Sequence, residues 1–212
     1  KIIKMHDTYI STKNKNSKDE LLGYLDEIAK FHFNNFHKDE ISVRLGVERI
    51  KYFYKSIIMD ENCKVDLKVK NSKIIFIIVF LKNYTQFMKK QKSTNLLSIV
   101  KNLIMNKITL RDLYDSLIFG KNVKKFIPEM YINNGLGSAI FNQSFKKDFV
   151  EVKNFFSIYK ENVNSVDGCW GSCRVGNKSA RKLLEYFGGE IAGTANGVHF
   201  IKLIRKSKYK AL

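Results

Sequence analysis

The sequence predicts an α/β domain in which helices flank a mixed central sheet. Three observations support this class: helical periodicity in the first third of the chain, two adjacent apolar strand patterns in the middle, and alternating strand and helix patterns towards the end. Of the 212 residues, 44% are hydrophobic and 13% aromatic, which is enough for one sizeable core. Because the chain shows no internal repeat and no polar linker, we expect residues 1–212 to form a single domain.

The first third of the chain predicts one short strand and two helices. Residues 9–10 form the strand candidate. A capping-box pattern at Ser17 and Glu20 precedes apolar residues at helical spacing, so we expect a helix over residues 17–33. Apolar side chains with the same spacing predict a second helix over residues 47–59.

The middle of the chain predicts a β-hairpin followed by a helical insert. Residues 64–69 alternate between apolar and polar types, which is typical of a half-buried strand. Residues 73–81 are almost continuously apolar, as in a strand covered on both faces. Residues 84–118 predict one or two helices. Their apolar stripe comprises Leu96, Leu97, Val100, Leu103 and Ile104.

The last third contains a glycine turn among further strands and helices. The expected elements are a short strand near Ile127, a helix from Ser138 to about Phe156, a strand over 167–175, a helix over 178–187 and strands near 190–192 and 198–204. Between the first two lie Pro128, the only proline, and the turn Gly135-Leu136-Gly137. A glycine loop that opens a helix presents free backbone N–H groups and a positive dipole end, which suit phosphate.

Charge and composition limit the classes of partner. The net charge of +18, from 38 Lys and Arg against 20 Asp and Glu, favours anionic partners such as phosphorylated cofactors, nucleotide sugars, nucleic acid or an anionic membrane. The excess is mostly lysine among abundant Asn, Ile and Phe, a pattern typical of an AT-rich genome, so charge alone does not decide for nucleic acid.

Targeting and cysteine patterns favour a cytoplasmic protein. No signal peptide pattern is visible, although Lys1 is not a natural start and a leader or initiator residue is expected before it. The apolar run over 74–81 is far shorter than the ~20 residues that span a bilayer. Three cysteines, an odd number, argue against a disulfide framework, and the spacing of Cys169 and Cys173 is not that of a typical zinc site, so we expect free thiols and no metal.

Two segments resemble motifs of the GNAT superfamily of acyl-CoA-dependent N-acyltransferases. Residues 128–139, PEMYINNGLGSA, are similar to the pyrophosphate loop, written Q/R-x-x-G-x-G/A after a strand and a proline. Residues 177–189, NKSARKLLEYFGG, resemble the later Asn-x-x-Ala-x-x-x-Tyr-x-x-x-Gly segment. His32, Phe36, Phe53 and Tyr54 are similar to positions in the first two helices of the family. The resemblance covers nearly the whole chain and implies a GNAT-like mixed sheet with a helical insert near 84–118.

The resemblance implies acetyl-CoA, or another acyl-CoA, as cofactor. The backbone N–H groups of Leu136, Gly137 and Ser138 would hold the pyrophosphate, and the strand ending near Phe126 and Ile127 would pair with the pantetheine arm. The implied cofactor-binding residues are Phe126, Ile127, Asn134, Gly135, Leu136, Gly137, Ser138, Ala139, Asn177 and Ala180. Ile132 replaces the usual Arg or Gln of the loop, and Leu184 replaces a tyrosine proposed to protonate the leaving thiolate.

The implied reaction is direct attack of an amine on the thioester carbonyl, which needs positioning, carbonyl polarisation and proton removal. The candidate catalytic residues are Glu129, His32 and Asn177. Each also has a structural interpretation: Glu129 as a solvated loop charge, His32 as a satisfied core histidine, and Asn177 as the N-cap of the next helix. Cys173 is a poor nucleophile candidate because no histidine is close to it in sequence.

The predicted function is N-acyl transfer to a primary amine of a small molecule such as an amino sugar or sugar nucleotide. Whether the protein is a homodimer stays open. Basic residues of the insert would meet an anionic acceptor; these are Lys89, Lys90, Lys92 and Lys101. Two alternatives stay open. One is an acyltransferase acting on protein or aminoacyl-tRNA, which the charge favours. The other is a degenerate GNAT fold acting as a non-catalytic binding module, which Ile132 and Leu184 favour.

Overall fold

The computed structural model describes residues 7–14, 17–36, 41–93 and 110–204. Within these residues, seven strands form one sheet in the order β1-β2-β3-β4-β5-β7-β6. The strands are β1 (Asp7–Ser11), β2 (Cys63–Lys70), β3 (Lys73–Leu81), β4 (Gly135–Phe141), β5 (Gly168–Arg174), β6 (Gly189–Ala195) and β7 (Val198–Ile204). Neighbouring strands are antiparallel except β4 and β5, which are parallel.

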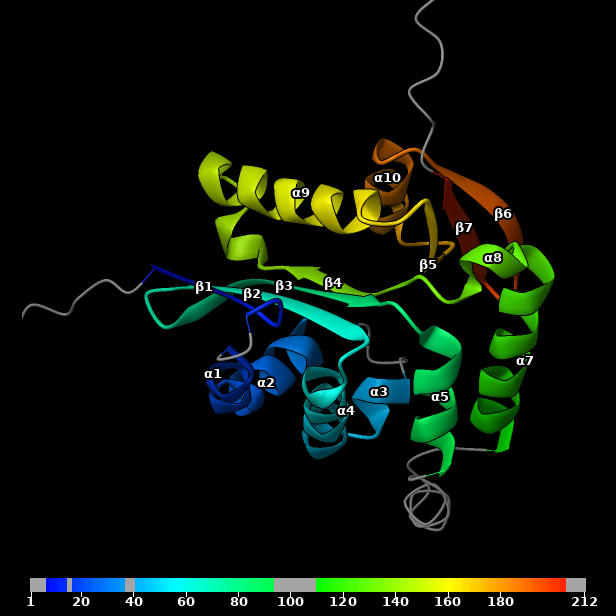
Figure 1. Cartoon of the computed structure of the whole chain (residues 1–212), viewed down its shortest axis with the longest axis horizontal. Helices are drawn as coiled ribbons and strands as arrows, with labels where there is room; N and C mark the ends of the chain where they lie inside the picture. The colour runs from blue at the N-terminus through cyan, green and yellow to red at the C-terminus, as the bar shows by residue number, and fades with distance from the viewer. Residues whose placement is uncertain (1–6, 15–16, 37–40, 94–109, 205–212) are drawn as a thin grey trace, which may run out of the picture.

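Helices cover both faces of the sheet (Figure 1). One face carries α1 (Ser17–Gly23), α2 (Leu25–Asn35), α3 (Ile41–Arg44) and α4 (Val47–Met59), and the other carries α9 (Phe149–Asn164) and α10 (Lys178–Tyr186). Near the β5–β7–β6 end of the sheet stand α5 (Tyr84–Ser93), α7 (Leu110–Phe126) and the short α8 (Glu129–Ile132), while the turn η1 (Gln143–Phe145) follows β4.

Strand β3 is the centre of the core. Its residues from Ile74 to Leu81 are all at least 93% buried. Ile77 and Val79 pack in the cluster formed with α1, α2 and α4, whereas Phe76 and Phe80 pack in the cluster formed with α9. The prediction of a strand covered on both faces is therefore confirmed. The burial of these apolar side chains stabilises β3 at the centre of the sheet.

Several predicted elements are confirmed. Four predictions match the observed elements: the helix over 47–59, the hairpin of β2 and β3, the strand β5 and the helix α10. The helix predicted over 17–33 is divided at Tyr24, immediately after Gly23, which is a poor helix former. Helices α5 and α7 lie in the predicted insert, while its apolar stripe at 96–104 falls outside the described residues.

The segment before β4 differs from the prediction. The strand predicted near Ile127 is wrong, because Phe126 ends helix α7 and Ile127 follows it in a buried cluster with Val123 and Trp170. Ile127 N–H donates to the carbonyl of Val123 at 2.9 Å, which continues the helical bonding pattern. Phe126 and Ile127 therefore offer no strand edge to a pantetheine arm.

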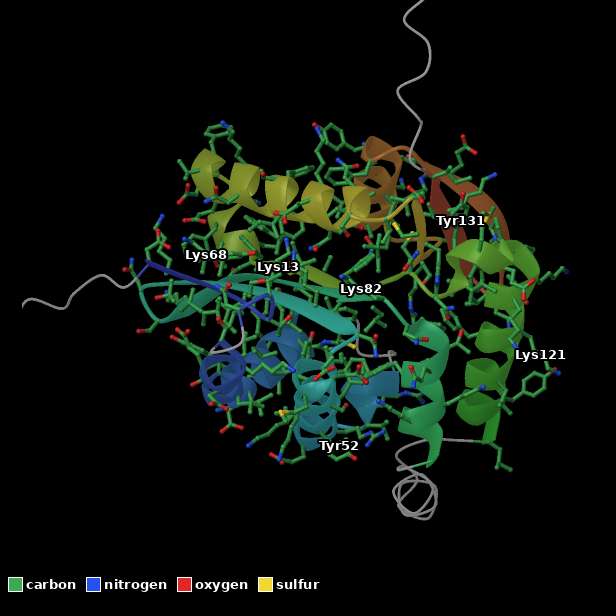
Figure 2. All side chains as sticks on the ribbon, viewed as in Figure 1. Lys13, Tyr52, Lys68, Lys82, Lys121 and Tyr131 are labelled. Atoms are coloured by element: carbon green, nitrogen blue, oxygen red, sulfur yellow. The ribbon has the colours of Figure 1, made fainter. Side chains whose placement is uncertain are left out.

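Helix α8 packs closely on β5. Tyr131, labelled in Figure 2, lies against Gly168, where an added Cβ would come within 2.3 Å of the tyrosine ring. The indole of Trp170 donates to the carbonyl of Ile132 at 2.8 Å, and Trp170 is 3% exposed. Trp170 is thus a packing residue. Among the helices of the described part of the chain, none is both long and apolar enough to cross a membrane.

Candidate functional site

The parallel strands β4 and β5 separate after a single paired position. Gly135 is opposite Trp170, and Trp170 N–H donates to the carbonyl of Asn134 at 2.9 Å. Beyond that point the described residues show no pairing between the two strands. The rest of β4, from Leu136 to Phe141, therefore bonds to β3 on one side only and has an open edge on the other.

The open edge of β4 carries backbone groups that can bind a ligand. Asn142 N–H donates to the carbonyl of Ile75 on β3 at 2.7 Å. Because successive peptide groups of a strand point to opposite sides, those of Ala139 and Phe141 point away from β3, towards the space left by β5. An extended ligand with amide groups can bond to such an edge as an additional strand would.

The glycine segment lies in this strand, and the predicted glycine turn that opens a helix is wrong. Gly137 and Ser138 form a bulge, because the register with β3 shifts there by one residue. A Cβ on Gly137 would lie 2.9 Å from Val79, so close packing on β3 accounts for the glycine. Leu136, Gly137 and Ser138 lie in a strand and do not form a helix N-terminus, and their role in holding pyrophosphate stays a prediction.

A cavity of about 2390 Å³ fills the opening between β4 and β5. On one face of the sheet it reaches α2 and α4, and on the other it reaches α9 and α10. Ser138 and Ala139 line it from β4, Ser172 from β5, and Asn177 and Ala180 from α10. The structure therefore brings together several predicted cofactor residues, although Phe126, Ile127, Asn134 and Gly135 do not line the cavity.

His32 lies at the α2 end of this cavity in a hydrogen-bonded chain. It is 4% exposed, its Nδ1 lies 3.0 Å from the hydroxyl of Tyr54, and its Nε2 lies 3.2 Å from the hydroxyl of Ser42. Burial lowers the pKa of His32 to about 4, so the ring is neutral near pH 7. Burial raises the pKa of Tyr54, and its hydrogen bond with Ser138 opposes that rise. The chain thus connects His32 to the bulge of β4, but a base of such low pKa is weak.

Glu129 is separate from this arrangement. It begins α8, is exposed, and lines a second cavity of about 610 Å³ between α5 and the end of α7. Lys89 and Lys124 line the same cavity. Since Glu129 does not line the cavity at β4, the structure offers no geometry in which it would act there as a base.

Asn177 is the N-cap of α10. Its side chain accepts a hydrogen bond from Ala180 N–H at 3.0 Å, which is the structural interpretation expected from the sequence. The same residue also lines the cavity beside β4. Its amide nitrogen can contact a ligand while its oxygen caps the helix.

We expect Asn177→Ala to lower the free energy of unfolding by about 1 kcal/mol, because α10 loses its cap, and Asn177→Asp to keep most of it. Urea denaturation of both variants measures this. Equal stability of the alanine variant and the parent protein would contradict the cap assignment. Loss of ligand binding in both variants would show a second role for the amide nitrogen.

The cysteines are free and buried. Burial raises the pKa of Cys169 to about 12 and also raises the pKa of Cys173, so neither is an activated thiolate. The register places His199 directly opposite Cys173, a neighbour that sequence distance did not reveal. However, His199 Nδ1 lies 2.8 Å from the hydroxyl of Thr194, and its Nε2 has no partner in the described structure. Among the described residues, no group of His, Cys, Asp and Glu could hold a metal ion.

Strand β4 leads through a short loop to the N-terminus of helix α9. The carboxylate of Asp148 lies at this N-terminus. The Asp148 side chain accepts the N–H of Glu151 at 3.3 Å. Lys70 lies 3.0 Å from Asp148 and 3.2 Å from Glu151. The pattern Asp148-x-x-Glu151 is a helix-start signal that would have placed α9 correctly. This end of the site thus carries two carboxylates and a paired lysine, and the neighbouring edge of β4 is open.

Comparisons with known proteins agree on the fold. No protein-family model matches the chain, and no curated protein matches it. The solved PaiA N-acetyltransferase from Thermoplasma acidophilum, in complex with coenzyme A, aligns with a TM-score of 0.50 at 9% identity over 93% of this chain and 99% of that one. A dodecameric spermidine N-acetyltransferase from Vibrio cholerae aligns with a TM-score of 0.49 at 11% identity over 93% of each chain. The N-acetyltransferase PseH from Campylobacter jejuni aligns with a TM-score of 0.43 at 12% identity over 94% and 98%.

The likeness to these solved N-acetyltransferases shows that this chain has the GNAT fold. The fold prediction, a mixed sheet flanked by helices with a helical insert, is confirmed.

Proposed function

We propose that the protein is an N-acyltransferase that moves an acyl group from a pantetheine thioester, with acetyl-CoA as the first to test, to a primary amine. The observation that carries this proposal is the open edge of β4, whose outward peptide groups border the cavity between β4 and β5. The arm of such a thioester contains two amide groups, which match the alternating donors and acceptors of a strand edge.

The cavity gives the acceptor its own approach. The α2 and α4 side offers Asn34, Asn35 and Arg49 beside the aromatic rings of Phe53 and Phe87. An amine that enters from this side would meet the thioester at the β4 bulge, near Ser138. We propose a small polar amine, such as an amino sugar or sugar nucleotide, because these lining groups combine amides, a cation and apolar rings. We also propose that residues 1–212 act as one domain in the cytoplasm and that two copies form a homodimer.

The chain from Ser138 through Tyr54 to His32 would position the reacting amine and accept hydrogen bonds from it. Ser138 lies on the bulge, and the buried Tyr54 and neutral His32 hold it through hydrogen bonds. In this proposal His32 is a positioning residue, since its low pKa does not suit direct proton removal.

A pair of proline variants tests the role of the strand edge. We expect Ala139→Pro to weaken acetyl-CoA and acetyl-pantetheine binding about tenfold, because it removes an N–H that points into the cavity while leaving the β3 bonds in place. Its matched control is Ile140→Pro, which removes an N–H directed at β3 and should lower the free energy of unfolding by at least about 2 kcal/mol. Calorimetric titration and urea denaturation measure the two effects. Unchanged binding by a folded Ala139→Pro variant would refute the role of the edge.

A second candidate is a GNAT fold that binds a thioester without turnover. Leu184, at the position of the usual tyrosine, is 5% exposed and packs towards Gly171. It therefore offers no acid for the leaving thiolate. Thiol release measured over a panel of amines separates the candidates, because only the enzyme releases thiol in proportion to acceptor.

A further inference from the structure

The N-terminus of α9 already holds an anion that belongs to the protein. The hydrogen bond from Lys70, followed by hydrogen bonds from Glu151 N–H and Val150 N–H, lowers the pKa of Asp148, so its carboxylate is charged near neutral pH. Glu151 is 1% exposed and adds a second carboxylate in the same helical turn. Asp148 therefore accepts the Glu151 N–H at this helix end, and Lys70, which could otherwise bind a phosphate here, is paired with Asp148 and Glu151.

A pyrophosphate placed at this turn would be repelled. It would lie near two carboxylates, and like charges at about 4 Å cost about 1 kcal/mol in water and about 4 kcal/mol in a partly buried site. The loop from 142 to 148, NQSFKKD, contains no glycine that would let a phosphate approach the backbone closely. The site thus accommodates the arm of the donor but does not accommodate the diphosphate of free coenzyme A at the helix.

Exposed lysines lie on the elements that cover this same face of the sheet. They come from three places: the loop before α9, the second turn of α9, and α10. The residues are Lys146, Lys147, Lys153, Lys178 and Lys182, and all are exposed. Of these, Lys153 and Lys182 line the cavity. In the part of the chain that the structure describes, no ion pair is formed by any of the five.

The spacing of these lysines over α9, α10 and a loop suits a broad acidic surface better than one compact diphosphate. Complementary charge of this kind speeds encounter and orients a partner, and its effect decreases with salt. The net charge of +18 acts in the same direction. An acidic partner that also delivers a pantetheine thioester would match the lysines by its charge and the open edge of β4 by the amide groups of its arm.

We propose that the acyl donor is a 4′-phosphopantetheine thioester attached to an acidic carrier protein, which docks on the exposed lysines of α9, α10 and the loop before α9; this rests on the proposed function. The amine nitrogen attacks the thioester carbonyl, an N–C bond forms and the C–S bond breaks. The proton lost by the amine ends on the leaving sulfur, so the products are an amide and the free thiol of the carrier. The carrier has a single phosphate on its arm, and this phosphate stays outside at the carrier surface.

Three thioester probes test the proposal by calorimetric titration: acetyl-pantetheine, acetyl-CoA, and a bacterial acyl carrier protein bearing an acetylated arm. We expect acetyl-CoA to bind within about threefold of acetyl-pantetheine, because its diphosphate finds no site at α9. We expect the carrier to bind at least about tenfold more tightly at low salt and to lose this advantage at high salt. Acetyl-CoA binding at least about tenfold more tightly than the other two probes would overturn the proposal.

Charge reversal locates the docking surface. The double variant Lys146→Glu with Lys178→Glu, at two lysines of this surface that do not line the cavity, should weaken carrier binding at least about tenfold and leave acetyl-pantetheine binding within about twofold. The matched control is Lys55→Glu with Lys121→Glu, which changes net charge equally; Lys121 lies on α7, away from α9 and α10 (Figure 2). Equal effects of the two double variants would contradict a specific surface.

The outcomes also separate this inference from the proposed function. If acetyl-CoA binds best and releases thiol with an amine panel, the protein is an acyltransferase and only the carrier proposal is wrong. If none of the three probes binds or releases thiol, the proposed function itself fails.

Discussion

Asp66→Ala should destabilise the protein by about 3–5 kcal/mol, the usual cost of removing one partner of a buried ion pair. Asp66 is fully buried on β2 and lies 3.1 Å from Lys64 Nζ, whose side chain is 8% exposed. Burial lowers the pKa of Lys64 and the Asp66 carboxylate opposes this, so the variant leaves a buried ammonium group without its counter-charge. Urea denaturation near neutral pH measures the loss.

The same carboxylate holds α9 on the sheet. It accepts hydrogen bonds from the hydroxyls of Tyr9 and Ser11, both at 2.7 Å, and from the amide of Asn162 on α9 at 2.9 Å. Lys64 in turn donates to the Asn162 oxygen at 2.6 Å. Because α9 lines the cavity, we expect Asp66→Ala to loosen one wall of the site as well as lower stability.

Two variants control this result. Tyr9→Phe removes one hydrogen bond at a partly exposed group and should cost about 1–2 kcal/mol. Lys64→Met added to Asp66→Ala removes the unpaired ammonium group, so the double variant should be no less stable than Asp66→Ala alone. A loss of less than about 1 kcal/mol for Asp66→Ala, or simple addition of the two single effects, would contradict a coupled network.

Local periodicity predicted most of the fold. The helix over 47–59 and the hairpin were accessible because their patterns repeat over eight or more residues and their partners are adjacent in sequence. The conformation of the glycine segment could not be predicted in this way, because it depends on a distant strand. Gly137 is required where β4 passes Val79, and nothing within the segment 128–139 reveals that contact. A short motif of glycines was therefore interpreted as a turn although it is part of a strand.

The candidate site was predicted in part for the same reason. His32, Ser138 and Asn177 line one cavity, and their roles in the site stay predictions. Three predicted site residues lie elsewhere. Phe126 ends α7 and Ile127 follows it, while Glu129 lines another cavity. The carboxylate that occupies the N-terminus of α9 was missed because the helix itself had been placed about ten residues too early.

We expect the protein to lose stability on acidification because His32 is buried in its neutral form. Its pKa in the fold is about 4, below the ordinary 6.5, because burial disfavours the charged ring. As pH falls below 6.5 the unfolded chain therefore binds a proton that the folded chain does not. Stability present above that pH is lost progressively towards pH 4, and linkage gives a loss of about 2 kcal/mol between about pH 7.5 and about pH 5.

Two variants separate the titration of His32 from its hydrogen bonds. His32→Gln has no titrating ring, so the difference in unfolding free energy between about pH 7.5 and about pH 5 should shrink by about 2 kcal/mol. Tyr54→Phe removes the 3.0 Å contact but leaves the ring of His32 buried, so it should keep the pH dependence. If both variants retain the full acid loss, His32 is not its source. If it is the source, acid would charge the ring that stacks on Phe36 at 4.0 Å.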